Sequence, residues 1–278
     1  MTLKTWFITG ATAGIGRAVT EQLLSQGHRV AATARHPEAL ADLAEKYPDL
    51  LWTAPLDVTD TQALRAVVDR VFTEVGPVDV VFSNAGRGSV GAAEELTDEL
   101  IDSQIALNMT APIQLLRAVL PHLRAQGGGR FVQTSTMGAH ITTPGASMYH
   151  ASKWGVEGFF ESVIPEVTPF GVGITMVEPG VIRTTFGANL DIAPGMPEYA
   201  AGPAGQIRGY LTTVDNVTAQ APGDPQKVAA AIIASAEDSP APRRLALGSD
   251  AYSAMRTALS DRIAELDAGK ATAASTDF

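Results

Sequence analysis

The chain has 278 residues, of which 45% are hydrophobic and 18% are charged, a composition typical of a packed globular protein rather than a disordered one. Its formal net charge of −10 disfavours nucleic acids and anionic membranes as partners, because both select a basic protein face. The absence of cysteine excludes disulfides, thiol catalysis and cysteine-ligated zinc, and it agrees with a reducing cytoplasm.

Apolar runs alternate with amphipathic stretches through the first two-thirds of the chain. Short apolar runs bounded by turn residues predict strands at 5–10, 28–34, 50–57, 78–86, 128–135, 172–180 and 243–249. Apolar residues at helical spacing predict helices at 15–27, 37–47, 59–76, 98–124 and 149–168, with a terminal helix after 249. Inside the helix at 98–124, Pro112 and Pro121 predict bends or breaks.

This alternation predicts the α/β fold class. Strands that alternate with helices form a parallel sheet covered on both faces, and right-handed crossovers make it a doubly wound (Rossmann) sheet, here of about seven strands. We expect a single domain over 1–270 and a flexible tail at 271–278. The segment 186–226 is rich in Gly, Pro and Ala, which predicts an irregular loop that caps a substrate.

Other site classes find little support in the sequence. The five histidines show no spacing typical of metal ligands, so no metal site is expected. The N-terminus has one lysine and a short apolar run, unlike a signal peptide, and no apolar stretch is long enough to cross a bilayer. We therefore expect a cytoplasmic protein without a membrane or nucleic-acid partner.

The stretch TGATAGIG at 9–16 follows the first predicted strand and leads directly into a helix. Its glycines, at 10, 14 and 16, allow a sharp turn and a close approach of the backbone to a ligand. The N–H groups of the following helix can then hold a pyrophosphate. This context predicts a dinucleotide site, although the spacing differs from G-x-G-x-x-G; an ordinary glycine-rich turn is the alternative.

The end of the second strand indicates which dinucleotide binds. An acidic residue there would accept a hydrogen bond from the adenosine ribose and select NAD. Here Ala34 occupies that place and Arg35 follows, and a guanidinium can pair with a 2′-phosphate. The sequence favours NADP over NAD. Arg17 either adds a second positive contact or covers the helix with its stem.

The stretch YHASK places Tyr149 four residues before Lys153, which brings both to one face of a helix. A nearby ammonium stabilises a phenolate, so this pair can make the phenol an exchangeable proton source near neutral pH. The alternative is that Tyr149 packs in the core and Lys153 is solvated.

Four further motifs accompany these: LDV at 56–58, SNAG at 83–86, LNMT at 107–110 and EPGVIRT at 178–184. In this order, the motifs resemble the short-chain dehydrogenase/reductase family in its shorter branch, over residues 5–184 and more weakly over 223–249. Ser83 departs from the family's usual N-N-A-G. The resemblance implies cofactor-binding roles for Gly10, Thr12, Ala13, Gly14, Ile15, Gly16, Arg35, Asp57, Val58, Asn84, Ala85, Gly86, Tyr149, Lys153, Pro179, Gly180, Ile182 and Thr184.

The resemblance also implies a catalytic set. Tyr149 would be the acid/base, Lys153 would lower its pKa and hold the nicotinamide ribose, and Asn108 would complete a proton path through water. Asn108 could instead be a helix-kink residue that bonds to backbone near Pro112. The hydroxyl that polarises the substrate oxygen is Thr136 by ungapped register and Ser135 by the S-x-x-G pattern; the register favours Thr136, and both stay open.

These features predict an oxidoreductase that transfers a hydride between NADP(H) and a carbonyl or secondary alcohol. Apolar residues in the capping segment favour a hydrophobic small molecule: Phe186, Leu190, Ile192, Met196, Tyr199, Ile207, Tyr210 and Leu211. A non-catalytic NADP(H) sensor and a sugar-nucleotide epimerase of the extended branch are the alternatives. By resemblance, the helix that bears Tyr149 and Lys153 would join a homodimer or homotetramer.

Overall fold

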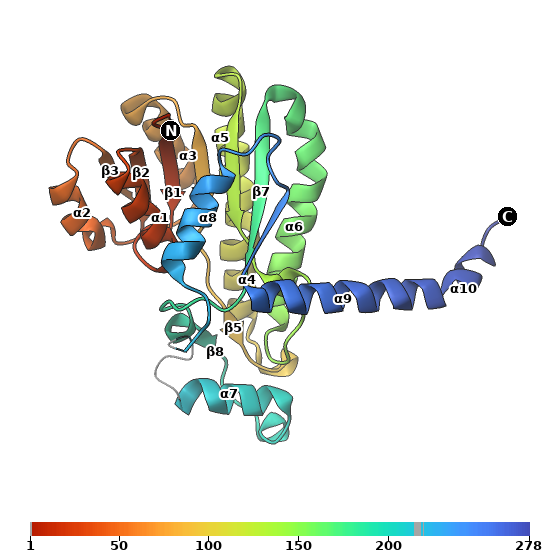
Figure 1. The fold of residues 1–278 in the computed structure, drawn as a ribbon. Coiled ribbons are helices and arrows are strands. Elements are labelled where there is room, and N and C mark those ends of the chain that lie inside the picture. The colour runs from red at the N-terminus through yellow and green to blue at the C-terminus, as the bar shows by residue number, and fades with distance from the viewer. Residues whose placement is uncertain (1, 214–217, 219) are drawn as a thin grey trace.

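A computed structural model describes residues 2–213, 218 and 220–278 of the chain. Seven parallel strands form one sheet in the order β3-β2-β1-β4-β6-β7-β9 (Figure 1). Their bounds are Thr5–Thr9 (β1), Arg29–Ala34 (β2), Leu51–Pro55 (β3), Val80–Ser83 (β4), Gly129–Thr134 (β6), Val172–Pro179 (β7) and Arg244–Leu247 (β9). Strand order reverses between β1 and β4, which confirms the predicted doubly wound sheet.

Helices cover both faces of the sheet. Their bounds are Gly14–Ser25 (α1), Ala41–Lys46 (α2), Thr61–Arg70 (α3), Asp98–Ile105 (α4), Ala111–Ala125 (α5), Ser147–Val167 (α6), Pro203–Thr213 (α7), Pro225–Ser235 (α8), Ser249–Ala268 (α9) and Lys270–Ala274 (α10). Buried residues of α3, α5 and α6 share one core cluster, and those of α1, α2 and α8 share the other.

Successive side chains of each strand point to opposite faces, and this alternation divides the core in two. Phe7 and Phe131 pack on the side of α3, α5 and α6, while Ile8 and Phe82 pack on the side of α1 and α8. All four side chains are fully buried. Burial of each contributes about 1.5–3 kcal/mol, so both layers hold the sheet in place.

The predicted helix at 98–124 is one continuous path with a local irregularity. A π-helical turn, Ala106–Thr110, joins α4 to α5, and Pro112 lies in the first turn of α5. The predicted break at Pro121 is wrong, because α5 continues to Ala125. Buried neighbours on the same helix, including Val119 and Leu123, hold it against the sheet and offset the missing hydrogen bond.

The segment 186–226 is more ordered than its composition predicts. Its residues Asp191–Ile192 (β8) pair in parallel with Ser89–Val90 (β5), and α7 runs over Pro203–Thr213. Proline is favourable in the first helical turn, where its missing N–H is not needed, and Pro203 is the first residue of α7. The Gly, Pro and Ala content of the segment did not predict this helix. Residues 214–217 and 219 of the predicted loop lie outside the described residues.

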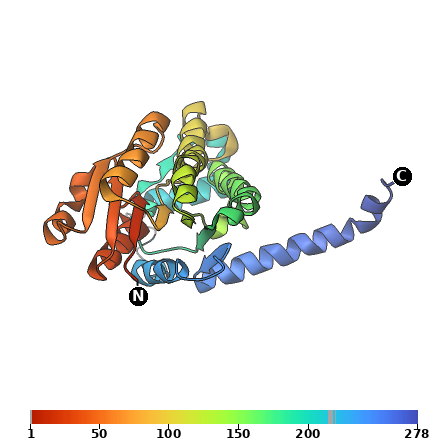
Figure 2. The same cartoon turned by 90° about the horizontal axis from the view of Figure 1, so that it is seen from above.

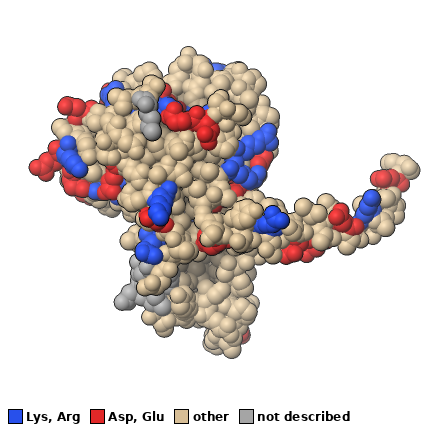
Figure 3. Space-filling model, viewed as in Figure 1, with Lys and Arg blue, Asp and Glu red and all other residues tan. Residues whose placement is uncertain are grey.

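The C-terminal helix α9 leaves the body of the molecule as an arm, seen in both ribbon views (Figures 1 and 2). The predicted flexible tail at 271–278 carries a further short helix, α10, whose alanine-rich sequence has high helix propensity. Figure 3 shows acidic and basic side chains interspersed over the face in view, arm included. Among the described residues, no helix is both long and apolar enough to span a bilayer.

Candidate active site

The glycine-rich turn between β1 and α1 lies at the carboxyl edge of the sheet. Gly10 and Gly14 have φ angles of +68° and +54°, which L side chains rarely adopt. A Cβ on Gly16 would lie 2.2 Å from the carbonyl oxygen of Gly10, so only glycine permits this approach. Ile15 packs against the core beneath the turn. The glycines therefore shape the turn itself.

The first turn of α1 can accept an anion. No described side chain caps Ala13, and the turn holds no acidic residue, so the positive end of the helix dipole is not neutralised. Thr12, Ala13 and Gly14 line a hollow of about 490 Å³ together with Arg17 and Arg183. An uncapped helix start beside two guanidinium groups fits the pyrophosphate of a dinucleotide.

Arg17 serves structure as well as charge. Its Nε lies 2.6 Å from a carboxylate oxygen of Glu21, and its guanidinium pairs with Asp42 and donates to the carbonyl of Ala39. These contacts tie α1 to the segment that follows β2. Arg17 therefore enters the hollow already paired, which leaves less of its charge for a ligand than the sequence suggested.

Arg35 is exposed at the end of β2, and within the described part of the chain no ion pair engages it. Hydrogen bonds from Thr59 lower the pKa of the Asp57 carboxyl, and the charge of Arg35 lowers it further. The positive charge of Arg35 therefore acts on the Asp57 carboxylate. Val58, which follows, is buried.

The SNAG turn after β4 is joined to the glycine loop. The Asn84 side chain donates to the carbonyl of Gly10 at 3.0 Å, and its backbone N–H donates to Oγ1 of Thr9 at 3.1 Å. A Cβ on Gly10 would lie 2.9 Å from Cα of Ala85. The SNAG turn and the glycine loop, which are joined through residues 74 positions apart, therefore pack directly against each other.

Gly86 sits over the side chains of Asn108 and Lys153. A Cβ there would lie 3.3 Å from Oδ1 of Asn108 and 3.8 Å from Nζ of Lys153. Asn108 stands in the π-helical turn, a feature often found at functional sites. Its amide accepts from the N–H of Arg87 at 3.0 Å and donates to the carbonyl of the same residue at 2.7 Å.

These hydrogen bonds partly distinguish the two predicted roles of Asn108, a place in a proton path and a structural bond to backbone. The side chain does bond to backbone, but to the loop after β4 and not near Pro112. It also lies 3.3 Å from Oγ of Ser152, one residue before Lys153. Asn108 therefore fixes the loop after β4 to α6, the helix that carries Tyr149 and Lys153.

The EPGVIRT turn after β7 closes the other side of the nucleotide hollow. The N–H of Gly180 donates to Leu247, and Ile182 pairs with Gly223 in an isolated bridge. Thr184 packs on Gly14, where a Cβ would lie 3.4 Å from Cγ2 of the threonine. Pro179, the last residue of β7, and Ile182 are buried, so the turn is anchored at both ends.

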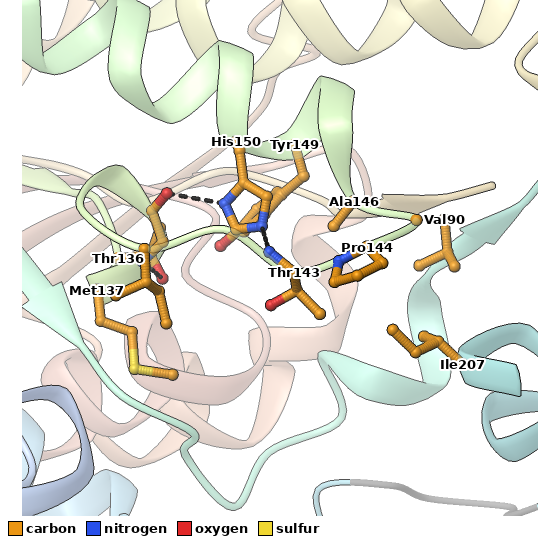
Figure 4. A pocket seen from close by; sticks show the side chains of 12 residues that line it. Val90, Thr136, Met137, Thr143, Pro144, Ala146, Tyr149, His150 and Ile207 are labelled. Atoms are coloured by element: carbon orange, nitrogen blue, oxygen red, sulfur yellow. Dashed lines mark hydrogen bonds between the residues drawn. The ribbon is translucent and has the colours of Figure 1, made fainter. Parts of the chain in front are cut away.

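A second cavity, of about 210 Å³, lies beside α6 and contains Tyr149 and Thr136 (Figure 4). Desolvation raises the pKa of the Tyr149 phenol, and a hydrogen bond with the Thr136 side chain opposes that rise. The lining is mainly apolar: Val90, Met137, Ile141, Pro144, Ala146 and Ile207 surround Thr136, Thr143, Tyr149 and His150. Figure 4 shows His150 bonded to Gly138 and Thr143, which holds the loop over the cavity.

Ser135 points away from this cavity. Its hydroxyl donates to Oε1 of Glu157 at 2.5 Å, and the residue is 2% exposed. Its N–H still bonds to Val177 of β7, so the strand pattern extends beyond Thr134 and neighbouring side chains alternate. Of the two hydroxyls that the sequence left open, Thr136 faces Tyr149 and Ser135 does not.

Lys153 is buried, with 4% of its surface exposed, and its Nζ donates to the carbonyl of Thr134 at 2.9 Å. Burial lowers the pKa of Lys153 to about 8, and the carboxylate of Glu157 acts in the opposite direction. Solvation of Lys153, the simpler sequence reading, is therefore wrong. Burial is the largest influence on the Tyr149 phenol and raises its pKa.

The sequence analysis missed a buried polar cluster beside the cavity. His140, Glu157 and Glu178 come from three different elements, and their ligand-type atoms lie within 4.8 Å of one another. Arg244 of β9 contacts Glu178 at 2.9 Å and Glu157 at 2.9 Å. Glu157 stands four residues after Lys153, a spacing that could have marked it as a partner of that lysine.

A second missed feature is a clamp on the capping segment. The side chain of Glu95 is fully buried and accepts from the N–H groups of Ala92 and Met196, each at 2.8 Å. Arg208 of α7 contacts it at 2.5 Å. The arginine therefore holds α7 beside the cavity, and it is engaged by the protein itself rather than free for an anionic substrate.

The clamp predicts a specific pH dependence of stability. Backbone hydrogen bonds from Met196 and Ala92 lower the pKa of Glu95 to about 2, below its ordinary 4.5. A depressed carboxyl pKa contributes stability above the unfolded value, and that stability is lost as pH falls toward the folded value. Glu95→Gln should therefore lower the thermal midpoint by a constant amount from pH 7 to about 4.5, and by less below that.

Thermal unfolding between pH 7 and 3 measures this difference. Glu94→Gln is the matched control, because Glu94 is exposed and accepts a hydrogen bond only from Tyr199 within the described residues. A difference between wild type and Glu95→Gln that disappears already between pH 7 and 5 would contradict the low pKa of Glu95.

Comparison with known proteins gives a family for this constellation. The family model for short chain dehydrogenases matches residues 4–194. The chain belongs to the short-chain dehydrogenase/reductase family. The match and the seven-stranded sheet confirm the family and the fold that the resemblance implied. The chain is accordingly an oxidoreductase of the kind that interconverts CH–OH and C=O groups with a nicotinamide dinucleotide.

Individual relatives agree with this assignment. Oxidoreductase BOA17 of Botryotinia fuckeliana is 34% identical over 250 residues, covering 89% of this chain and 90% of that one. Human 17-beta-hydroxysteroid dehydrogenase type 1 is 34% identical over 200 residues, covering 69% of this chain and 60% of that one. A short-chain dehydrogenase from Streptomyces avermitilis shares 38% identity with a TM-score of 0.91, and both chains are fully covered. Similar folds have been solved with 5-hydroxy-NADP and with NAD.

Proposed function

We propose that this short-chain dehydrogenase/reductase transfers a hydride between NADP(H) and a carbonyl or secondary alcohol of a hydrophobic small molecule, with Tyr149 as acid/base. One observation carries the proposal. Tyr149 and Thr136, a proton donor and a hydrogen-bond donor, both line one mainly apolar cavity. Such a pair can hold and protonate one oxygen atom while the surrounding wall excludes water.

The nucleotide-binding residues are those at the carboxyl edge of the sheet. The first turn of α1 would hold the pyrophosphate, and Asp57 with Val58 would meet the adenine. Arg35 supports NADP over NAD, because an exposed guanidinium with an uncharged Ala34 beside it can receive a 2′-phosphate. When bound, the nicotinamide would exchange the hydride with the substrate carbon and, once oxidised, add positive charge beside the phenol.

The protein residues manage the proton. In the reducing direction, Thr136 donates a hydrogen bond to the carbonyl oxygen, and the Tyr149 hydroxyl gives its proton to that oxygen as negative charge develops. The phenolate that remains needs stabilisation, because burial of Tyr149 disfavours charge there. Lys153, on the next turn of α6, is the protein cation placed to supply it, and Asn108 fixes the loop that shields this lysine.

The cavity wall supports a hydrophobic substrate. Ile207 of α7 lines the cavity, and the ring of Phe186 lies 6.1 Å from that of Tyr149, both from the predicted capping segment. Arg208, the charged residue of α7, is used by Glu95. The human relative's name, a hydroxysteroid dehydrogenase, indicates an apolar alcohol as its own substrate, and we infer the same class for this chain.

A coenzyme-dependent activity screen tests the proposal. Purified protein should oxidise NADPH in the presence of hydrophobic ketones or aldehydes and reduce NADP with the matching secondary alcohols. Polar and carboxylated carbonyls of similar size serve as controls and should react more slowly. NADPH binding without turnover on any carbonyl or alcohol would favour the non-catalytic sensor instead.

Association through α6 stays a prediction. Trp154 on that helix is 41% exposed, and Ala151, Gly158 and Ser162 on the same side are exposed too. Small residues beside an exposed tryptophan would let a second copy approach closely, which supports a homodimer or homotetramer.

A further inference from the structure

The cluster around Glu157 touches the active site at two points. On one side, Glu157 accepts a hydrogen bond from the hydroxyl of Ser135, and the next residue, Thr136, faces Tyr149. On the other, it stands one helical turn after Lys153 and acts on the charge of that lysine. Glu157 is 3% exposed, so its carboxylate can be buried only because partners satisfy it.

Besides Ser135, two partners of Glu157 come from other parts of the chain. Nη2 of Arg244 in β9 lies 2.9 Å from it, and Nε2 of His140 lies 3.7 Å from it. Glu178 of β7 brings a second carboxylate, and burial together with this like charge raises the pKa of Glu157. Glu161, one turn further along α6, pairs with the same Arg244.

The cluster has the composition of a metal site, but its cation is already present. The Arg244 guanidinium donates to Glu178 through Nε and to Glu157 through Nη2. A divalent ion among His140, Glu157 and Glu178 would compete with this arginine for the same oxygens. Arg244 therefore takes the place of a metal ion in this cluster and holds Glu157 by its carboxylate.

Because side chains alternate at the end of β6, the contact between Glu157 and Ser135 also affects the direction of Thr136, whose hydroxyl would bind the substrate. Ser135 and Thr136 point in opposite directions, so the residue that binds one hydroxyl decides the direction of the other. The 2.5 Å hydrogen bond from Ser135 to a carboxylate is charge-assisted and therefore strong. It favours the arrangement in which Thr136 faces the cavity.

We propose that Glu157 is a positioning residue of the reaction: clamped by Arg244, it holds Ser135 away from the cavity and keeps the buried Lys153 protonated. This role rests on the proposed reaction at Tyr149. The negative charge of Glu157 acts to keep the proton on Lys153, and the hydrogen bond that Glu157 accepts from Ser135 stabilises that charge.

The charge of Lys153 can be measured without substrate or cofactor. The chain has five lysines, so lysine labelled with ¹³C at Cε gives a simple NMR spectrum, in which Lys153→Arg assigns the signal. Glu157→Gln should lower the pH at the titration midpoint of Lys153 by about one pH unit or more, because it removes the nearby negative charge. Glu161→Gln is the matched control. It also removes one negative charge that pairs with Arg244, but it should leave the midpoint of Lys153 nearly unchanged.

Equal midpoints in all three proteins, or equal shifts in both variants, would overturn the role of Glu157 in holding that proton. This readout stays valid even if the proposed reaction is wrong, since it needs no turnover.

Ser135→Ala tests the second part of the proposal, the contact that holds Ser135, because it removes the hydroxyl that Glu157 binds and keeps the carboxylate. With a substrate found in the screen, Thr136→Val should lower kcat by about 100- to 1,000-fold, as loss of an oxyanion donor does. Ser135→Ala should cost less than about tenfold, since Ser135 acts only through position. A loss in Ser135→Ala as large as in Thr136→Val would overturn the assignment.

Discussion

Tyr149→Phe is expected to lower kcat for carbonyl reduction by about 100- to 10,000-fold, the range that a positioned general acid contributes. The phenylalanine ring keeps the packing against Phe186 and removes only the hydroxyl that bonds to Thr136. NADPH affinity should stay within about twofold of wild type, because the glycine loop and Arg35 are untouched. Steady-state kinetics and a fluorescence titration with NADPH measure the two quantities separately.

Tyr252→Phe is the control for this substitution, since Tyr252 is 58% exposed on the α9 arm, away from the cavity. It should retain wild-type kcat. Turnover by Tyr149→Phe at more than about a tenth of the wild-type rate would mean that another group supplies the proton.

Arg35→Glu is expected to lower kcat/KM for NADPH by about 10- to 100-fold while leaving NADH nearly unaffected. The substitution removes a charge-assisted hydrogen bond to the 2′-phosphate, worth about 1.5–3 kcal/mol, and places a carboxylate beside it. NADH has no such phosphate, so only the NADPH reaction should respond. The ratio of the two kcat/KM values is the quantity to measure.

Arg256→Glu changes the net charge by the same amount on the exposed arm and controls for long-range electrostatics. It should leave the coenzyme ratio unchanged. If Arg35→Glu lowers both coenzymes equally, Arg35 supports the site in general, and the NADP preference has another source.

The sequence determined the sheet well because its signals are local. Each strand is a short apolar run ended by a turn residue, and the observed bounds differ from the predicted ones by a few residues at most. The turn at Gly10 was predictable for the same reason, since only glycine allows its φ. Local signals misled at Pro121, where packing overrides the break that proline predicts, and in the segment 186–226, where composition did not predict the helix that begins at Pro203.

The sequence predicted which residues form the candidate site, but it did not predict which way their side chains point. Ser135 and Thr136 both carry hydroxyls, and two sequence signals disagreed, since the register favoured Thr136 and the S-x-x-G pattern favoured Ser135. That choice depends on Glu157, which is 22 residues away from Ser135, and on Arg244, which is 87 residues from Glu157. Burial of Lys153 likewise depends on the fold, since a lysine on a helix is more often solvated.

The capping segment shows the same limit. Its apolar residues indicated a lid, but the contact that holds α7 joins Arg208 to Glu95, 113 residues earlier in the chain. Composition cannot reveal such a pair. The α9 arm was predicted as a terminal helix, and only the structure shows that it leaves the body (Figure 2).

A crystal structure of the protein with NADP and an unreactive analogue of a hydrophobic ketone tests the central claim most directly. The carbonyl oxygen should lie about 2.6–3.2 Å from both the Tyr149 hydroxyl and Oγ1 of Thr136, with the nicotinamide ring beside the carbonyl carbon. A ketone oxygen bound by Ser135, or a ligand outside the cavity that Tyr149 lines, would contradict the account.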